Sequence, residues 1–299
     1  MQLDNGAINV IDVLENRGFT AFLVGGCVRD SLLGKTPKDW DIATSATPEQ
    51  VIDMFNKTVP TGIKHGTVTV MIDGTPYEVT TYRSDGAYGD HRRPDEVFFS
   101  NNINDDLSRR DFTINAIAYS PYSGFVDPFG GIDDIRKGII KTVGNADERF
   151  NEDPLRMMRA VRFHAALGFK IEEGTMSSIR RNHKLLEYIS KERIRDEFVK
   201  TILASPDSVK ILLDTGLMDY IVPRAKIMVG FDQNNKHHNM NLLDHTISVM
   251  NNVPNTVVLR LAAFLHDIGK PFTASIGEDG FSHFYMHGEE SAKLSLSIL

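Results

Sequence analysis

Residues 23–34, LVGGCVRDSLLG, and residues 38–42, KDWDI, are the stretch that decides the fold. The apolar residues before the glycine pair predict a strand, and the residues after it predict a helix. A strand–Gly-Gly–helix turn lets the backbone approach a phosphate closely, with N–H groups at the helix start pointing toward it. Gly26 and Arg29 would then face a triphosphate. Such turns are common in proteins, so this pattern alone does not identify a site.

Asp39 and Asp41 follow this turn, and Asp39 lies ten residues after Arg29. Residues i and i+2 of a strand project to the same side, so both carboxylates are expected to face one cavity. Like charges this close are unfavourable unless a cation lies between them. Hard oxygen ligands beside a triphosphate suit Mg²⁺, which would activate a hydroxyl and stabilise a pyrophosphate leaving group. An isolated Asp-x-Asp is usually an exposed turn, but the preceding glycine pair makes the combination specific.

Length and composition describe an ordinary globular protein. The chain has 299 residues, which predicts two or three folding units, and a net charge of −7. This charge argues against a surface that coats nucleic acid everywhere but allows one basic face. Cys27 is the single cysteine, which excludes a disulfide framework and favours a reducing cytoplasm. The start MQLDNGAINV has no signal-peptide pattern, and no apolar run is long enough to span a membrane.

Secondary-structure signals change along the chain. Residues 1–145 alternate short strands and helices, whereas apolar residues recur at helical spacing from residue 154 onward. The predicted strands are residues 20–24, 67–72, 77–82 and 97–100, and the predicted helices are residues 9–17, 154–167, 175–189, 193–203 and 208–213. Residues 156–200 contain eleven Lys and Arg against six Asp and Glu. This basic helical segment is either a solvated face or a surface that binds phosphates.

The combination of GGCVRD at residues 25–30 with DWD at residues 39–41 resembles the signature of the bacterial CCA-adding tRNA nucleotidyltransferases. These enzymes belong to the polymerase β-like superfamily, together with the bacterial poly(A) polymerases. Three further blocks are similar in order: RRDFTINA at residues 109–116, DPFGG at residues 127–131 and EDPLRMMRAVRF at residues 152–163. The similarity covers about residues 20–200.

The resemblance implies an α+β fold, with a small mixed-sheet head followed by a helical neck and body. We expect a catalytic head at residues 1–145, a neck and body for nucleotide selection and tRNA binding at residues 146–235, and a partial HD-type metal domain at residues 236–299. It also implies CTP and ATP as substrates and the tRNA 3′ end as acceptor. The implied site residues are the Mg²⁺ ligands and catalytic residues Asp39 and Asp41, and the nucleotide-binding residues Gly26, Arg29, Arg109, Arg110, Asp111, Asp153, Arg156, Arg159 and Arg162.

The chemistry of Asp153 and Arg156 suits C and A. At helical spacing i and i+3 they would share one face, where Asp accepts hydrogen bonds and Arg donates them. Cytosine and adenine each present an amine donor beside a ring-nitrogen acceptor, whereas uracil and guanine present the reverse. Each unpaired buried polar group costs about 1–3 kcal/mol, so this pair would exclude U and G. An ordinary salt bridge on a helix surface is the alternative.

Residues 83–97, RSDGAYGDHRRPDEV, are polar and contain Gly and Pro, which predicts a mobile loop. Their similarity to the family's flexible loop favours full CCA addition over CC addition. A plain connecting loop is the alternative.

Six of the ten histidines lie after residue 235. His266-Asp267 follows an apolar helical run, and His245 lies one predicted helix earlier. This resembles the HD phosphohydrolase superfamily, in which a first His, a His-Asp pair and a distant Asp bind a divalent metal, here expected to be Ni²⁺, Co²⁺ or Mn²⁺. No plausible final Asp ligand precedes Leu299, so we expect either a fragment or a vestigial site.

The sequence therefore predicts template-independent addition of C and A to the tRNA 3′ end. Poly(A) polymerase or an A-adding enzyme is the first alternative, and an HD-type metal phosphohydrolase that binds RNA is the second. A catalytically silent tRNA-binding protein is disfavoured because both Asp39 and Asp41 are present.

Overall fold

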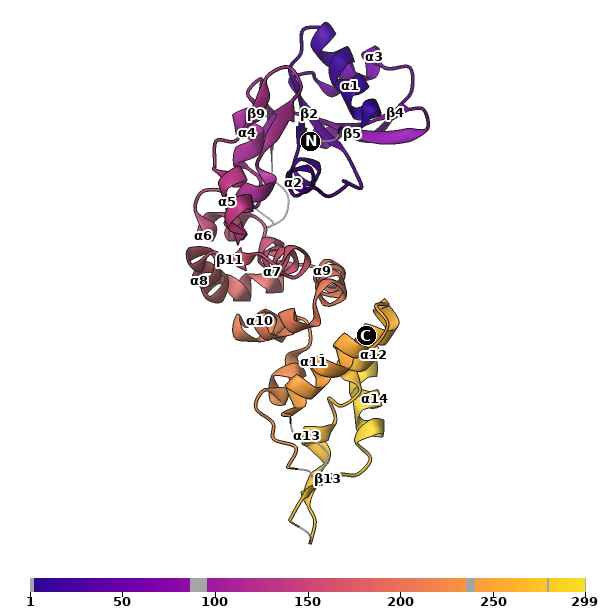
Figure 1. The fold of residues 1–299 in the computed structure, drawn as a ribbon, viewed down its shortest axis with the longest axis vertical. Coiled ribbons are helices and arrows are strands. Elements are labelled where there is room, and N and C mark those ends of the chain that lie inside the picture. The colour runs from indigo at the N-terminus through magenta and orange to yellow at the C-terminus, as the bar shows by residue number, and fades with distance from the viewer. Residues whose placement is uncertain (1–2, 87–95, 235–239, 279, 299) are drawn as a thin grey trace. The chain divides into compact units, whose positions relative to one another are not determined.

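The computed structural model describes residues 3–86, 96–234, 240–278 and 280–298. The chain divides into two compact units (Figure 1). The first unit contains Met1–Asp153 and Lys170–Ser178, and the second contains Pro154–Phe169 and Ile179–Leu299. The three-part division with boundaries after residues 145 and 235 stays a prediction.

A seven-stranded sheet forms the centre of the first unit, in the order β3-β4-β5-β2-β1-β8-β9. β2 runs parallel to β5, and the other neighbouring strands are antiparallel, so the predicted mixed sheet is confirmed. The strands are β1 (Ala21–Val24), β2 (Asp41–Thr44), β3 (Thr58–Gly62), β4 (Thr67–Ile72), β5 (Thr75–Thr81), β8 (Ala118–Ser120) and β9 (Gly124–Val126).

Helices contact both faces of this sheet. On one face, α1 (Asn5–Asn16) contacts β1, β2 and α3 (Pro48–Met54), and Figure 1 shows the two helices close together. Elsewhere in the unit, α2 (Gly26–Leu32) follows β1 directly and contacts α5 (Gly131–Lys137), and α4 (Ile103–Ser108) contacts β2.

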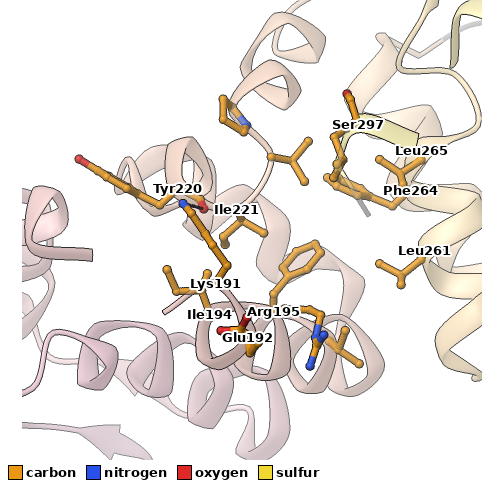
Figure 2. Close-up of a pocket in the computed structure, with 15 residues that line it drawn as sticks. Lys191, Glu192, Ile194, Arg195, Tyr220, Ile221, Leu261, Phe264, Leu265 and Ser297 are labelled. Atoms are coloured by element: carbon orange, nitrogen blue, oxygen red, sulfur yellow. Dashed lines mark hydrogen bonds between the residues drawn. The ribbon is translucent and has the colours of Figure 1, made fainter. Parts of the chain in front are cut away.

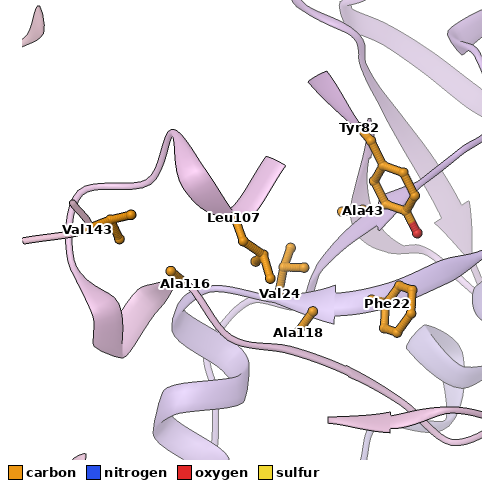
Figure 3. Packing of buried hydrophobic residues seen from close by; sticks show 8 residues of the cluster. All are labelled: Phe22, Val24, Ala43, Tyr82, Leu107, Ala116, Ala118 and Val143. Atoms are coloured by element: carbon orange, nitrogen blue, oxygen red, sulfur yellow. The ribbon is translucent and has the colours of Figure 1, made fainter. Parts of the chain in front are cut away.

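A cluster of buried hydrophobic residues shows which face of the sheet carries the predicted site. Phe22 and Val24 of β1, Ala43 of β2 and Leu107 of α4 pack together in this cluster (Figure 3). Alternate residues of a strand share a face. Asp41, two residues before Ala43, therefore projects from the same face of the sheet as the cluster.

The second unit is helical, as expected, except for one hairpin that the sequence did not predict. Its helices are α7 (Leu155–Leu167), α9 (Lys191–Ala204), α10 (Val209–Asp214), α11 (Leu242–Asn252), α12 (Val257–Leu265), α13 (Lys270–Thr273) and α14 (His287–Ile298), while α8 (Glu173–Asn182) spans the division between the units. The hairpin pairs β12 (Ala274–Ile276) with β13 (Ser282–Phe284). Within the described ranges, every helix is too short or too polar to cross a lipid bilayer.

The prediction that Asp153 and Arg156 share one helix was wrong. α6 (Ala146–Glu152) ends before Asp153, and α7 begins at Leu155. Asp153 has an extended backbone, with φ −140° and ψ 97°. The cause is Pro154, because the ring of a proline clashes with a helical conformation of the residue before it.

The predicted mobile loop, residues 83–97, is described only at its ends. These ends pair as β6 (Arg83–Asp85) and β7 (Val97–Phe99). Residues 87–95 lie outside the described residues, as do His237 and His238.

Candidate active site

The glycine turn lies beside the start of β2. In the antiparallel pair of β1 and β2, Leu23 is opposite Ile42, so the turn that follows β1 is next to Asp41. Gly25 has φ 74° and ψ −130°, a conformation that favours glycine. The Arg110 guanidinium lies against it, with Nη1 2.8 Å from where a Cβ on Gly25 would be. Any larger residue at this position would therefore displace the arginine.

Three carboxylates gather at this end of the sheet. Glu78 of β5 lies directly opposite Asp41 in the parallel pair, so the two side chains project to the same side. Desolvation and the nearby charge of Glu78 raise the pKa of Asp41, against a lowering effect of Arg110, and Asp39 raises it further. A divalent cation would relieve this repulsion, and the carboxylates are the oxygen ligands that Mg²⁺ prefers. The arrangement therefore fits the expected ion.

Glu78 was missed by the sequence analysis. The predicted strand at residues 77–82 contains it, but nothing in the local pattern shows that this strand pairs in parallel with β2. Only the sheet register brings Glu78 and Asp41 together.

Asp106 anchors the two arginines at the end of α4. Its side chain is fully buried, and its two oxygens accept hydrogen bonds from Arg109 Nε at 3.0 Å and from Arg110 Nη2 at 2.9 Å. Burial acts to raise the pKa of Asp106, but Arg110 and Arg109 outweigh it and hold the pKa below the ordinary Asp value. The spacing i, i+3 and i, i+4 from Asp106 was the sequence signal that could have identified this residue.

Arg29 is held by a second chain of hydrogen bonds. Its Nη1 donates to Asn115 Oδ1 at 2.6 Å, and its Nε donates to Asp30 Oδ1 at 2.9 Å. Asp111 Oδ1 in turn accepts from Asn115 Nδ2 at 3.0 Å and from the Phe112 backbone N–H. Asp111 therefore orients the asparagine that orients Arg29.

The predicted neck residues lie on α7 and pack differently from one another. Arg156 is buried, with 8% of its surface exposed. Arg162 donates to Glu197 of α9 at 2.6 Å and lies 4.3 Å from the centre of the Phe163 ring, while Arg159 lies 5.4 Å from the same ring. Arg162 thus ties α7 to α9 through a buried acid.

His245, His266 and Asp267 come together in the second unit, as the sequence predicted. One donor atom from each lies within 4.8 Å of the other two. Asp267 Oδ2 is 3.0 Å from His266 Nε2 and 3.4 Å from His245 Nε2, and it accepts from the buried Lys270 ammonium at 2.8 Å. Burial acts to lower the pKa of His266, but the hydrogen bond with Asp267 outweighs it and the pKa is raised. The three donors fit a divalent ion with imidazole ligands.

A pocket of about 480 Å³ in the second unit contains none of the predicted site residues. Figure 2 shows Leu261, Phe264 and Leu265 on one side of it and Ile194 and Arg195 of α9 on the other. The candidate chemistry of the described residues therefore lies elsewhere, at the sheet edge and at the histidine cluster.

Two sequence profiles match the chain. Residues 21–141 match the "Poly A polymerase head domain", and residues 168–228 match the "Probable RNA and SrmB-binding site of polymerase A". The first match contains Asp39, Asp41 and Glu78, together with both arginine networks.

Similarity to relatives of known name shows the family to which the chain belongs. A CCA-adding enzyme of Lactobacillus delbrueckii subsp. bulgaricus is 52% identical over 215 residues, which are 71% of this chain, and one of Geobacillus kaustophilus is 51% identical over 218 residues. The crystal structure of the Bacillus stearothermophilus CCA-adding enzyme in complex with CTP is 33% identical, with a TM-score of 0.68, and the comparison covers 96% of this chain and 80% of that one. The chain belongs to the family of the CCA-adding enzymes. It spans about half the length of the curated relatives, 54% of each of these two.

Asp106→Asn should destabilise the first unit, because the amide keeps the shape of the side chain but removes the charge between two arginines. Both arginines are partly exposed, so we expect a loss of about 1–3 kcal/mol in the free energy of unfolding at neutral pH. The pKa of Asp106 is lower in the folded chain than its ordinary value of 3.8. Its contribution is therefore complete above that value and is lost as the pH falls through the lower folded pKa.

Denaturant unfolding of both proteins, from pH 7 down to about pH 3, measures this difference. Asp133→Asn is the matched control, since Asp133 makes an exposed i, i+3 pair with Arg136, and its effect should stay below about 0.5 kcal/mol. Equal effects of the two substitutions would show that Asp106 is not the anchor.

Proposed function

We propose that this chain adds C and A nucleotides to the 3′ end of tRNA, using CTP and ATP and releasing pyrophosphate. One observation carries the proposal: Asp41 and Glu78 project together from the sheet edge next to the glycine turn and Arg110, with Asp39 within electrostatic reach. This constellation provides ligands for cations and donors for phosphates at one place. The crystal structure of the B. stearothermophilus relative contains CTP, which supports a nucleotide at this kind of site.

Asp39 and Asp41, with Glu78 beside them, would hold Mg²⁺. When bound, the ion supplies a lower pKa for the attacking 3′-hydroxyl and charge neutralisation for the leaving pyrophosphate. The raised pKa of Asp41 supports this role, since desolvation and the charge of Glu78, which raise it, are both offset by a bound cation.

The arginines of the first unit would bind the triphosphate. Arg110 lies against the glycine turn, and Arg29 leaves the same turn on α2. Gly26 opens α2, where the absence of a side chain lets a phosphate approach the backbone. Asp111 and Arg109 would position the residues that bind the triphosphate. Asp111 orients Arg29 by way of Asn115. Arg109 shares the carboxylate of Asp106 with Arg110.

Asp153, Arg156, Arg159 and Arg162 would select and position the nucleotide. Asp153 offers acceptors and Arg156 offers donors, which complement the edges of cytosine and adenine. The extended backbone at Asp153 does not remove this complementarity, because selection depends on where the two side chains end and not on a shared helix. Arg162 would position α7 through Glu197.

The RNA would lie on the basic segment at residues 156–200, which overlaps the profile described as an RNA-binding site. The cytoplasm is the proposed location, in keeping with the single reduced Cys27. Poly(A) polymerase and A-adding activity remain the alternatives.

Incubation of the full chain with tRNA lacking CCA and with CTP, ATP, or both, tests the proposal. We expect two C additions with CTP alone and completion with A when both are present. Asp41→Asn should reduce incorporation by at least about 10³-fold, because it removes a charged metal ligand. Asp73→Asn, at an exposed turn, is the control and should keep full activity. Runs of A without C would establish the poly(A) alternative, and substantial activity of Asp41→Asn would refute the metal assignment.

Arg156→Ala should relax discrimination against UTP and GTP. A donor facing a donor costs about 1–3 kcal/mol, so its removal should raise misincorporation roughly tenfold relative to CTP. Because Arg156 is buried, Arg156→Lys is measured in parallel, and thermal unfolding checks the fold of both. A folded variant that loses CTP and ATP use equally, without misincorporation, would show that Arg156 is structural.

We also propose a divalent ion at His245, His266 and Asp267, favoured by the mutual closeness of their donor atoms. Imidazole ligands favour Ni²⁺, Co²⁺ or Mn²⁺ over Mg²⁺. In a calorimetric titration with excess Mg²⁺ present to occupy the carboxylates of the first unit, His266→Ala should abolish binding of Co²⁺ while nucleotide addition survives. His183→Ala is the control. Loss of CTP incorporation in folded His266→Ala protein would contradict two separate sites. Metal-dependent phosphate release would establish the phosphohydrolase alternative.

A further inference from the structure

A third histidine, His287, approaches Asp267 from α14. Its Nε2 lies 3.4 Å from Asp267 Oδ1, whereas His245 and His266 face the other oxygen, Oδ2. The side chain of Asp267 is 5% exposed, so imidazoles from three segments enclose one buried carboxylate. The resemblance to HD proteins predicts a distant Asp as the last ligand, but here an imidazole reaches the site.

In both His266 and His287, the backbone carbonyl three residues earlier contacts Nδ1 and sets the orientation of the ring. His266 Nδ1 lies 2.7 Å from the Ala263 carbonyl, and His287 Nδ1 lies 2.7 Å from the Phe284 carbonyl. A carbonyl only accepts, so Nδ1 carries the hydrogen in each ring. With Nδ1 occupied in this way, Nε2, the atom that faces Asp267, is the nitrogen available to a metal ion, and this is how metal-binding histidines are oriented in proteins.

α14 is anchored next to the His-Asp pair without any metal. The Gly269 N–H donates to Ser291 Oγ at 2.9 Å, and a Cβ on Gly269 would lie 2.7 Å from the His287 carbonyl oxygen. Only glycine allows this approach. Ser291 lies one helical turn after His287, so the contact places His287 on the face of α14 that meets Asp267.

We propose that His287 is the fourth protein ligand of the divalent ion held by His245, His266 and Asp267, so that the ion joins α14 to α11 and to the end of α12. This inference rests on the metal site proposed above. His287 lies outside the group of His245, His266 and Asp267, whose donor atoms are within 4.8 Å of one another, so its ring must shift toward the ion. Its side chain is 38% exposed, which leaves room for this shift. Three imidazoles and one carboxylate form a complete four-coordinate set that favours Co²⁺, Ni²⁺ or Zn²⁺ over Mg²⁺.

Titration of the full 299-residue chain with Co²⁺, after removal of metals by a chelator, tests the ligand assignment. Calorimetry gives the dissociation constant and the number of ions, and the visible spectrum of Co²⁺ reports its ligand set. With excess Mg²⁺ present to occupy the carboxylates of the first unit, we expect one Co²⁺ per chain. His287→Ala should weaken binding about tenfold to a hundredfold and change the spectrum. Two ions per chain would overturn the proposal, since Asp267 would then bridge separate sites.

Two further variants separate ligation from folding. His287→Asp supplies an oxygen ligand and should restore affinity to within about tenfold of the unmodified chain. His283→Ala is the matched control, because His283 lies four residues earlier on β13 and stacks on Tyr285. Its affinity for Co²⁺ should equal that of the unmodified chain. If His287→Ala does not fold, as judged by far-UV circular dichroism, the His287→Asp protein decides: its failure to bind Co²⁺ would overturn the proposal.

Hydrogen exchange of the α14 amides measures the link between helices. Co²⁺ should slow exchange across residues 287–298 in the unmodified chain and in His283→Ala, but not in His287→Ala. Unchanged affinity and equal protection in His287→Ala would exclude His287 as a ligand while leaving the three-residue site intact. Absence of Co²⁺ binding by the unmodified chain would instead refute the underlying metal site.

Discussion

Repulsion between carboxylates at one end of a sheet is the constraint on which the first unit depends. Asp41 and Glu78 are fixed opposite each other by the parallel register of β2 and β5, with Asp39 nearby, and desolvation together with the charge of Glu78 raises the pKa of Asp41. Such an arrangement lowers stability unless positive charge compensates it. The fold supplies part of that charge as Arg110, which the glycine turn admits at close range. The remaining deficit is what favours a cation at this edge of the sheet.

The arginines are themselves held by buried acids, and this explains the order of the residues at 106–115. A guanidinium that binds a phosphate must keep its direction when no phosphate is present, which requires a partner behind it. Asp106 provides that partner for Arg109 and Arg110, and Asp111 provides it for Arg29 by way of Asn115. Leu107, the residue after Asp106, packs into the sheet cluster and fixes α4 in place. Core packing and charge placement are therefore achieved by neighbouring residues of one segment.

Sequence reasoning found the residues whose spacing is local and missed those brought together by register. The glycine turn, Asp39, Asp41 and the His-Asp pair each stand in a short pattern, so their chemistry could be predicted. Glu78 could not, because parallel pairing of β2 with β5 joins segments that the local pattern does not connect. The prediction that Asp153 and Arg156 share one helix was wrong because it rested on their i, i+3 spacing alone, and the effect of Pro154 on its predecessor was not weighed.

In the histidine cluster, the negative charge of one buried carboxylate, Asp267, is compensated in a different way. Asp267 is surrounded by imidazoles and by Lys270, whose ammonium also donates to the buried Gln233 at 2.8 Å. Lys270 already balances the charge of Asp267, whereas Arg110 only partly compensates the carboxylates around Asp41. An ion at the histidine cluster would therefore be held mainly by imidazole coordination rather than by charge. This difference supports opposite preferences of the two proposed sites: oxygen ligands and Mg²⁺ at the sheet edge, nitrogen ligands and softer ions at the histidine cluster.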